Sequence, residues 1–166
     1  MKQKRIFIVG HLGAGKALLG KALAVKLGWK FVDANLSLER NVGRGLNEII
    51  GKQGEEKFQE LQGEILSHYL KIENVVVSTD DIIINSEKNR KLLKNEFVIY
   101  LKVNSAQQIE RMSYGPAPLL PISDLKGFFD KLHRERDVLF DQISKLTIDS
   151  ESVEADVDTI LKEIEK

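Results

Sequence analysis

The feature that most constrains this chain is a glycine-rich segment that directly follows a short apolar run. Residues 6–9 are apolar and mostly β-branched, which is typical of a buried parallel strand. Residues 10–16 match the pattern G-x-x-x-x-G-K, and helical spacing begins immediately behind them. In such a loop several backbone N–H groups converge on one anion, and the helix N-terminus adds its dipole. The segment predicts a phosphate-binding loop, and the plain alternative is a glycine-rich turn with an incidental lysine.

The residues of this loop predict how a nucleotide is held. We expect ATP or ADP to bind, with Lys16 reaching the β and γ phosphates. The position after the lysine departs from the motif, because a Ser or Thr hydroxyl normally ligates Mg²⁺ there, whereas Ala17 and Leu18 have no hydroxyl. Mg²⁺ binding should therefore be weakened. The expected nucleotide-binding residues of the loop are Gly10, Gly13, Ala14, Gly15, Lys16, Ala17 and Leu18.

Short apolar runs alternate with helical patterns along the rest of the chain. Gly28 should end the first helix, Gly51 and Gly54 should interrupt the third, and the proline-containing residues 113–123 should form a loop. Five strands alternating with helices predict an α/β fold with a mainly parallel sheet, in one domain spanning 1–166. The predicted strands are 6–9, 29–32, 75–78, 97–103 and 146–148, and the predicted helices are 18–27, 36–42, 46–70, 87–93, 106–112, 124–143 and 153–164.

The composition of the chain argues against several classes of binding partner and site. The 166 residues include 25 basic and 25 acidic side chains, so the net charge is zero and no basic field favours nucleic acid. The absence of cysteine excludes disulfides and cysteine zinc sites. The apolar run at 6–9 is too short for a signal peptide, and no stretch is long enough for a membrane span. We expect a cytoplasmic monomer that binds no nucleic acid and no membrane.

Several motifs follow one another along the chain: 10–16 with Gly20, 31–35 with Glu39, 54–58, Arg111 with 118–120, and Arg136 with 138–140. Their order resembles the shikimate kinase family. This resemblance implies a three-layer P-loop kinase fold, with a five-stranded parallel sheet of order 2-3-1-4-5 flanked by helices. Members of that family transfer the γ-phosphate of ATP to the 3-hydroxyl of shikimate with Mg²⁺, a step of aromatic amino acid biosynthesis.

The resemblance also implies roles for individual residues. Lys16 and Asp33 would be catalytic, and Asp33 would lie near the metal and its waters. Arg111 would lie against adenine, and Arg136 would bind the carboxylate of the acceptor, a small hydroxylated acid. The acceptor-binding region would span about 33–62 and the lid about 112–123.

Five departures from the family pattern fall on the acceptor and transfer side. Asn35 replaces the aspartate that polarises the attacking hydroxyl, Gln59 replaces a carboxylate-binding arginine, and Gln62 replaces a glutamate. Residues 80–82 (Asp-Asp-Ile) replace a triple glycine, and Ala117 replaces the lid arginine. The leading interpretation is therefore a nucleotide-binding pseudoenzyme of this type with weak or no shikimate phosphorylation.

Two other functions stay open. In the first, the chain is an active kinase for another small acceptor, with Asp80 or Asp81 holding the metal and Asp33 orienting the hydroxyl. In the second, it is a protein-interaction module that no longer binds nucleotide. For Asp80 and Asp81 we favour the plainer interpretation, which is substitution of an abandoned glycine turn.

The remaining candidate site residues are the three histidines and the arginines of the helix predicted at 124–143. His11 lies inside the phosphate loop, and we expect it to be a variable loop position; the alternative is that it lines the nucleotide site. His68 and His133 should be structural or surface residues, because the sequence suggests no partner at metal-binding spacing. Arg134 should lie on a solvated helix face, whereas Arg136 should be functional.

Overall fold

The computed structural model describes residues 3–34, 52–114 and 123–166. The predicted helix at 36–42, and with it Asn35, Glu39 and Ala117, lies outside the described residues, as do Gly51 and most of the predicted lid.

The core of the fold is a five-stranded sheet whose described strand pairs are all parallel. Its order is β2-β3-β1-β4-β5, which confirms the fold and the strand order inferred from the family resemblance. Each strand begins or ends within two residues of its predicted position. The strands are β1 (Arg5–Val9), β2 (Lys30–Asp33), β3 (Val75–Ser78), β4 (Phe97–Lys102) and β5 (Leu146–Asp149).

Six α-helices and one short 3₁₀ helix, η1, are described, and two features differ from the sequence prediction. The predicted interruption at Gly54 is wrong, because this glycine lies inside α4; one glycine costs a helix only about 1 kcal/mol. The 3₁₀ helix was not predicted, and its N-cap is Asp80, whose side chain accepts from Ile82 N–H. The elements are α1 (Lys16–Leu27), α4 (Lys52–Tyr69), η1 (Asp81–Asn85), α5 (Glu87–Leu93), α6 (Ser105–Tyr114), α7 (Leu125–Ile143) and α8 (Val153–Ile164).

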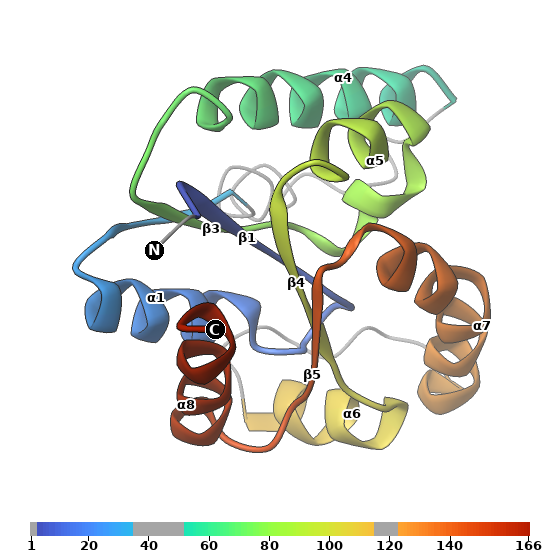
Figure 1. Ribbon diagram of the computed structural model, residues 1–166. Coiled ribbons are helices and arrows are strands. Elements are labelled where there is room, and N and C mark those ends of the chain that lie inside the picture. The colour runs from blue at the N-terminus through green and yellow to red at the C-terminus, as the bar shows by residue number, and fades with distance from the viewer. Residues whose placement is uncertain (1–2, 35–51, 115–122) are drawn as a thin grey trace.

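Alternating side chains of the strands build one apolar cluster on each face of the sheet. Ile6 and Ile8 of β1 join a cluster to which α1 and α8 contribute. Phe7 and Val9 point the other way, into a cluster that includes Leu66 of α4 and residues of η1, α5 and α7. Figure 1 shows this arrangement, with α4 and α5 on the opposite side of the sheet from α1 and α8. The three layers follow from the period of two along each buried strand.

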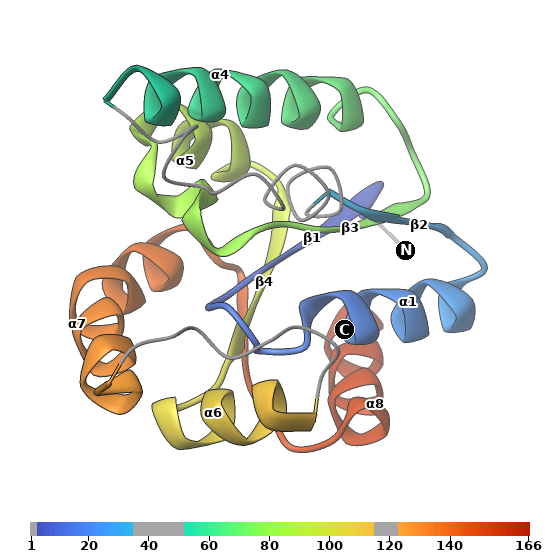
Figure 2. The same ribbon diagram turned by 180° about the vertical axis from the view of Figure 1, so that it is seen from behind.

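The carboxyl ends of the central strands bring the candidate site together. Ile8 of β1 lies opposite Ser78 of β3, and Val9 lies opposite Tyr100 of β4. The segments that follow these strands, including the phosphate loop, the turn at Asp80 and α6, therefore lie at one edge of the sheet. Figure 2 shows α6 beyond the end of β4, beside the connection from β1 to α1.

None of the helices in the described parts of the chain combines the length and the apolar character that crossing a bilayer requires.

Gly10 is held in a conformation that only glycine tolerates well. Its φ is 155°, and a Cβ there would lie 2.7 Å from the backbone oxygen of Leu101. Gly28 also has a positive φ, 68°, but its Cβ would meet nothing within 4 Å. We expect Gly28→Ala to cost about 1–2 kcal/mol through backbone strain alone, and Gly10→Ala to cost clearly more, because the carbonyl of a central strand cannot move aside. Urea unfolding of both variants measures the difference, and equal losses would contradict this account.

Candidate functional site: the phosphate loop and its surroundings

The phosphate loop is closed by its own lysine. Lys16 is the first residue of α1 and is 7% exposed, and its Nζ donates to the backbone oxygens of Gly10 and His11 at 2.9 Å each. The ammonium group is thus held across the loop, where an arriving phosphate can take over its donors. Ala14 is fully buried, whereas Leu18 is 67% exposed. The assignment of Leu18 and Ala17 to nucleotide binding stays a prediction.

α6 packs directly on this loop. A Cβ on Gly13 would lie 2.6 Å from Cγ of Met112, so the glycine permits the close approach of the two segments. Arg111 of α6 donates from Nη1 to the backbone oxygen of Ala14 at 2.6 Å. Its Nη2 donates to Ser150 Oγ at 2.9 Å and to the backbone oxygen of Glu151 at 3.2 Å. The predicted residue Arg111 therefore lies at the loop and joins it to the β5–α8 connection, while its role toward adenine stays a prediction.

Asp33, predicted to lie near the metal, is the last residue of β2. Its Oδ1 accepts a hydrogen bond of 3.1 Å from the hydroxyl of Ser78, the last residue of β3. This places a carboxylate at the same edge of the sheet as the loop, and its catalytic and metal-binding roles remain predictions.

Asp80 is a buried carboxylate close to the loop. It is 5% exposed, and both of its carboxylate oxygens accept from Gln62 Nε2 at 2.7 Å. Burial raises the pKa of Asp80 to about 6, while the amide of Gln62 and the positive charge of Lys16 act in the opposite direction. Asp80 is thus held in one orientation by α4 and lies within the electrostatic reach of the phosphate-binding lysine.

Gln62 and Asp80 are two departures from the family pattern that fit each other. The family glutamate at position 62 would place a second carboxylate against Asp80, and like charges that close disfavour each other's ionised form. An amide at position 62 instead donates to both oxygens of the carboxylate. The two replacements therefore count as one coupled change.

Arg136, predicted to bind the acceptor carboxylate, pairs with Asp81. Its Nη1 lies 3.1 Å from Asp81 Oδ2, and the two side chains are only 13% and 21% exposed. Asp81, which replaces a glycine of the family pattern, is thus an internal partner for the arginine that was expected to bind the acceptor, and that role of Arg136 stays a prediction.

A second cluster of polar side chains joins the loop to α7. The structural role expected of His133 stays a prediction, but the expectation that it has no partner at metal-binding spacing was wrong. His133 Nδ1 lies 3.0 Å from Oδ1 of Asp137, one helical turn further along α7. His11 Nε2 lies 2.5 Å from the same oxygen, and His11 is 1% exposed. The i,i+4 spacing of His133 and Asp137 was a readable signal, whereas the approach of His11 from a distant segment could not be seen in the sequence.

Burial and hydrogen bonds together set the charges of this cluster. Burial lowers the pKa of His11 to about 4, so that the ring is neutral near pH 7. Burial acts against the ionised form of Asp137, but hydrogen bonds from His11 and from the Tyr100 hydroxyl outweigh it and lower the pKa of this carboxyl. The Tyr100 hydroxyl donates to Asp137 Oδ1 at 2.9 Å.

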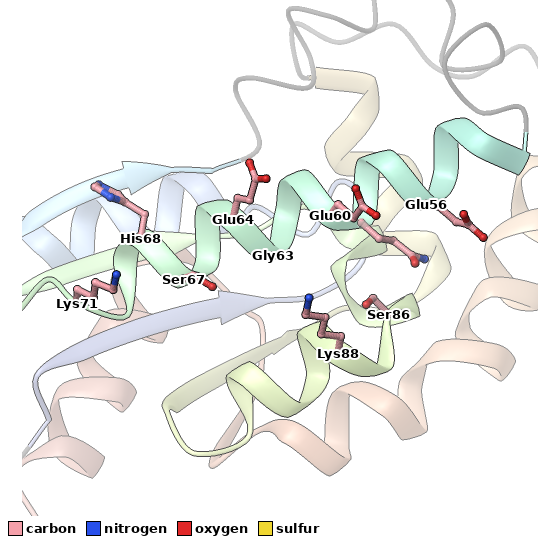
Figure 3. A pocket seen from close by; sticks show the side chains of 10 residues that line it. Glu56, Glu60, Gly63, Glu64, Ser67, His68, Lys71, Ser86 and Lys88 are labelled. Atoms are coloured by element: carbon pink, nitrogen blue, oxygen red, sulfur yellow. The ribbon is translucent and has the colours of Figure 1, made fainter.

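A separate hollow of about 770 Å³ lies along α4, and none of its lining residues belongs to the phosphate loop. Figure 3 shows the side chains of α4 and α5 around it. Gln59, expected at the acceptor site, lines this hollow, and its backbone oxygen accepts from Asn89 Nδ2 at 3.4 Å. The hollow mixes acidic and basic side chains, and its residues are Glu56, Gln59, Glu60, Gly63, Glu64, Ser67, His68, Lys71, Ser86 and Lys88.

Comparison with known proteins decides the family. The shikimate kinase family model matches residues 12–165. The chain therefore belongs to the shikimate kinase family. It is 31% identical to a shikimate kinase of Legionella pneumophila (strain Corby) over 166 residues, covering 98% of this chain and 95% of the relative. It is 33% identical to the enzyme of Francisella tularensis subsp. holarctica over 153 residues, covering 90% of this chain and 87% of the relative.

Solved structures show the same family resemblance. The shikimate kinase of Acinetobacter baumannii, solved in complex with shikimate, superposes with a TM-score of 0.83 at 28% identity and covers 98% of this chain and 93% of that chain. The enzyme of Bacteroides thetaiotaomicron gives a TM-score of 0.84 at 25% identity, covering 98% and 99%. Shikimate kinase membership supports nucleotide binding and kinase chemistry, and nothing in these comparisons indicates that activity is lost.

The buried carboxyl of Asp80 predicts a pH-dependent stability. Because its folded pKa is raised from 3.8 to about 6, its stabilising contribution is fully present below pH 4 and is lost as the pH rises through about 6. Relative to Asp80→Asn, which keeps the shape and the cap, the wild type should lose about 2–3 kcal/mol of unfolding free energy between pH 4 and pH 7.5. Urea unfolding across this range, without nucleotide or metal, measures the loss. A difference that does not change with pH would contradict it.

Proposed function

We propose that this protein is an ATP-dependent small-molecule kinase of the shikimate kinase family, in which Asp80 replaces the missing loop hydroxyl in supporting Mg²⁺. The observation that carries the proposal is the buried carboxylate of Asp80, oriented by Gln62 and influenced by Lys16. A buried ionisable group within the electrostatic influence of Lys16, with a pKa moved toward neutrality, has the properties of a functional carboxylate.

The residues at this edge of the sheet fit Mg²⁺. This ion takes oxygen ligands, usually one or two carboxylates with waters and substrate phosphates. Asp33 and Asp80 offer carboxylates at the ends of the neighbouring strands β2 and β3, while Ala17 offers none. When bound with the nucleotide, the ion supplies charge neutralisation of the phosphate oxygens. The chain itself binds the phosphates through the loop amides and Lys16, and Asp33 orients the acceptor hydroxyl.

The proposed acceptor is a small hydroxylated compound whose binding relies less on a carboxylate group than the binding of shikimate does. Arg136 is already neutralised by Asp81, so an anionic acceptor must compete with an internal ion pair. Gln59 cannot provide the bidentate charged contact of an arginine. Both features act against a carboxylate rather than against a hydroxyl.

The case for an active kinase rests on how the departures from the family pattern are related. Gln62 matches Asp80, and Asp81 pairs with Arg136. The replacements Gln62 and Asp80 are joined by direct hydrogen bonds, so they are not independent losses, and Asp81 is joined to the retained Arg136. Such matched changes are expected of a site that has been rebuilt for another ligand.

The second candidate is an ATP- or ADP-binding protein with weak or no shikimate phosphorylation. It is favoured by Ala17, which removes a metal ligand, and by Asn35 and Ala117, which remove a carboxylate and a positive charge from the transfer step. Loss of one such electrostatic contact typically raises a barrier by about 2.7–4 kcal/mol.

The deciding experiment measures nucleotide binding and turnover separately. Calorimetric titration of ATP with and without Mg²⁺ tests the binding site, and release of ADP in the presence of shikimate and of uncharged polyols tests the transfer. Turnover on a polyol that exceeds turnover on shikimate supports the proposal. Nucleotide binding without turnover on any acceptor favours the second candidate, and no binding at millimolar ATP overturns both.

Two variants test whether Asp80 helps to bind the Mg²⁺ ion that accompanies ATP. Asp80→Asn should remove most of the increase in ATP affinity that Mg²⁺ produces, because a carboxylate charge is lost, and Ala17→Ser should enlarge that increase by restoring a ligand. Asp81→Asn is the matched control, because it neutralises the adjacent carboxylate, which pairs with Arg136. A Mg²⁺ effect unchanged in Asp80→Asn would contradict the role of Asp80.

Asp81→Asn has an expected effect of its own on the acceptor side. Release of Arg136 from its ion pair should strengthen shikimate binding by roughly tenfold, since a hydrogen bond to a charged group contributes about 1.5–3 kcal/mol. Calorimetric titration of shikimate into the ADP-bound protein measures this, with Arg134→Ala as the control on the same helix. Weaker shikimate binding in Asp81→Asn would show that Arg136 does not contact the acceptor.

A further inference from the structure

We propose that His11, His133 and Asp137 form a binding site for a divalent transition-metal ion of the Zn²⁺ class, which joins the phosphate loop to α7. Among the described residues these three offer two imidazole nitrogens and a carboxylate oxygen that all lie within 4.8 Å of one another. The site is separate from the proposed Mg²⁺ site and does not depend on kinase activity.

The spacing of the ligand atoms suits a small ion. His11 Nε2 and His133 Nδ1 lie 2.5 Å and 3.0 Å from the same oxygen of Asp137. In a four-coordinate zinc site, with bonds of about 2.0–2.2 Å, neighbouring ligand atoms lie about 3.3–3.5 Å apart. These two separations therefore need to grow by less than about 1 Å to reach the spacing of a coordination site.

The partners of His133 decide which of its nitrogens can bind a metal. Gln108 Nε2 donates to the backbone oxygen of Leu12 at 2.8 Å, so the amide oxygen of Gln108 must face His133. That oxygen accepts from His133 Nε2 at 2.6 Å, which places a proton on Nε2. In the neutral ring Nδ1 then carries a lone pair, and this lone pair faces the carboxylate of Asp137.

A lone pair directed at a carboxylate requires a positive species between them. Either a second proton charges the ring, or a metal ion is bound by both groups. The hydrogen bond from the outer nitrogen of a histidine to an amide oxygen is the arrangement that orients metal-binding imidazoles in proteins. His11 is buried and neutral, and its Nε2 faces the same oxygen. Because Nε2 donates to Asp137 in the metal-free protein, metal binding requires the hydrogen to move to Nδ1 of this ring.

The chemistry and the access of the cluster point to zinc rather than magnesium. Two imidazoles and one carboxylate suit Zn²⁺ and its neighbours in the first transition row, whereas Mg²⁺ prefers oxygen ligands. The side chain of Asp137 is 32% exposed and that of His133 is 14% exposed, so an ion can enter from the α7 side. Three protein ligands leave a fourth position for water.

Metal binding to this cluster would affect the phosphate loop. His11 directly follows Gly10, and its backbone oxygen accepts from Lys16. An ion on His11 would anchor the loop to the helix that carries Arg136. Binding of the metal and binding of nucleotide should then change each other's affinity by the same factor.

The test uses the full chain with the metal alone. Calorimetric titration with Zn²⁺ should show one site per chain, and Co²⁺ should give the intense visible absorption of a tetrahedral site. His133→Ala and Asp137→Asn should each weaken Zn²⁺ at least tenfold and abolish the Co²⁺ band. His68→Ala is the matched control, because His68 is the third histidine of the chain and lies exposed on α4; it should bind as the wild type does.

Several outcomes overturn the proposal. They are no Zn²⁺ binding at micromolar concentration, equal binding in His133→Ala and the wild type, or loss of binding in His68→Ala. Nitrogen NMR that finds His133 doubly protonated after saturation with Zn²⁺ would assign the cluster to an ion pair with Asp137 instead. Far-UV circular dichroism checks that each variant is folded, and Asp137→Asn, which keeps the shape of the side chain, decides the matter if His133→Ala does not fold.

Discussion

The parallel pairing of β1 with β3 and β4 is the constraint on which the rest of the molecule depends. Because parallel strands end at the same edge of a sheet, this pairing collects the phosphate loop, the turn at Asp80 and α6 at one place. It also requires both faces to be covered, which explains the two apolar clusters and the layers of helices. The chemistry of the protein is confined to the segments that leave this edge.

Charges at that edge are arranged differently from the family pattern, and the arrangement is internally consistent. Asp80 is stabilised by the amide of Gln62, and Asp81 by the guanidinium of Arg136. In the proposed function, the carboxylate of Asp80 serves the nucleotide side, while Arg136, expected on the acceptor side, has an internal partner. Under the proposed function, both changes affect the choice of acceptor and metal support more directly than they affect phosphate binding.

Much of the fold could be predicted because its signals are local. The buried strands and most helix ends carry their own patterns, such as the glycine at position 28, which adopts a left-handed conformation after α1. The continuous α4 was missed at Gly54, because the packing of a long helix outweighs the small cost of one glycine. The helix η1 was missed because its start depends on the Asp80 side chain, which caps it after β3.

The sequence by itself determined the phosphate loop, the parallel α/β fold and the family, because each is encoded in short segments whose spacing can be read directly. It could not show that Gln62 meets Asp80, that Asp81 meets Arg136 or that His11 meets His133 and Asp137. These pairs are separated by between 18 and 126 positions along the chain. Only the packing of α4 and α7 against one face of the sheet brings them within hydrogen-bonding distance.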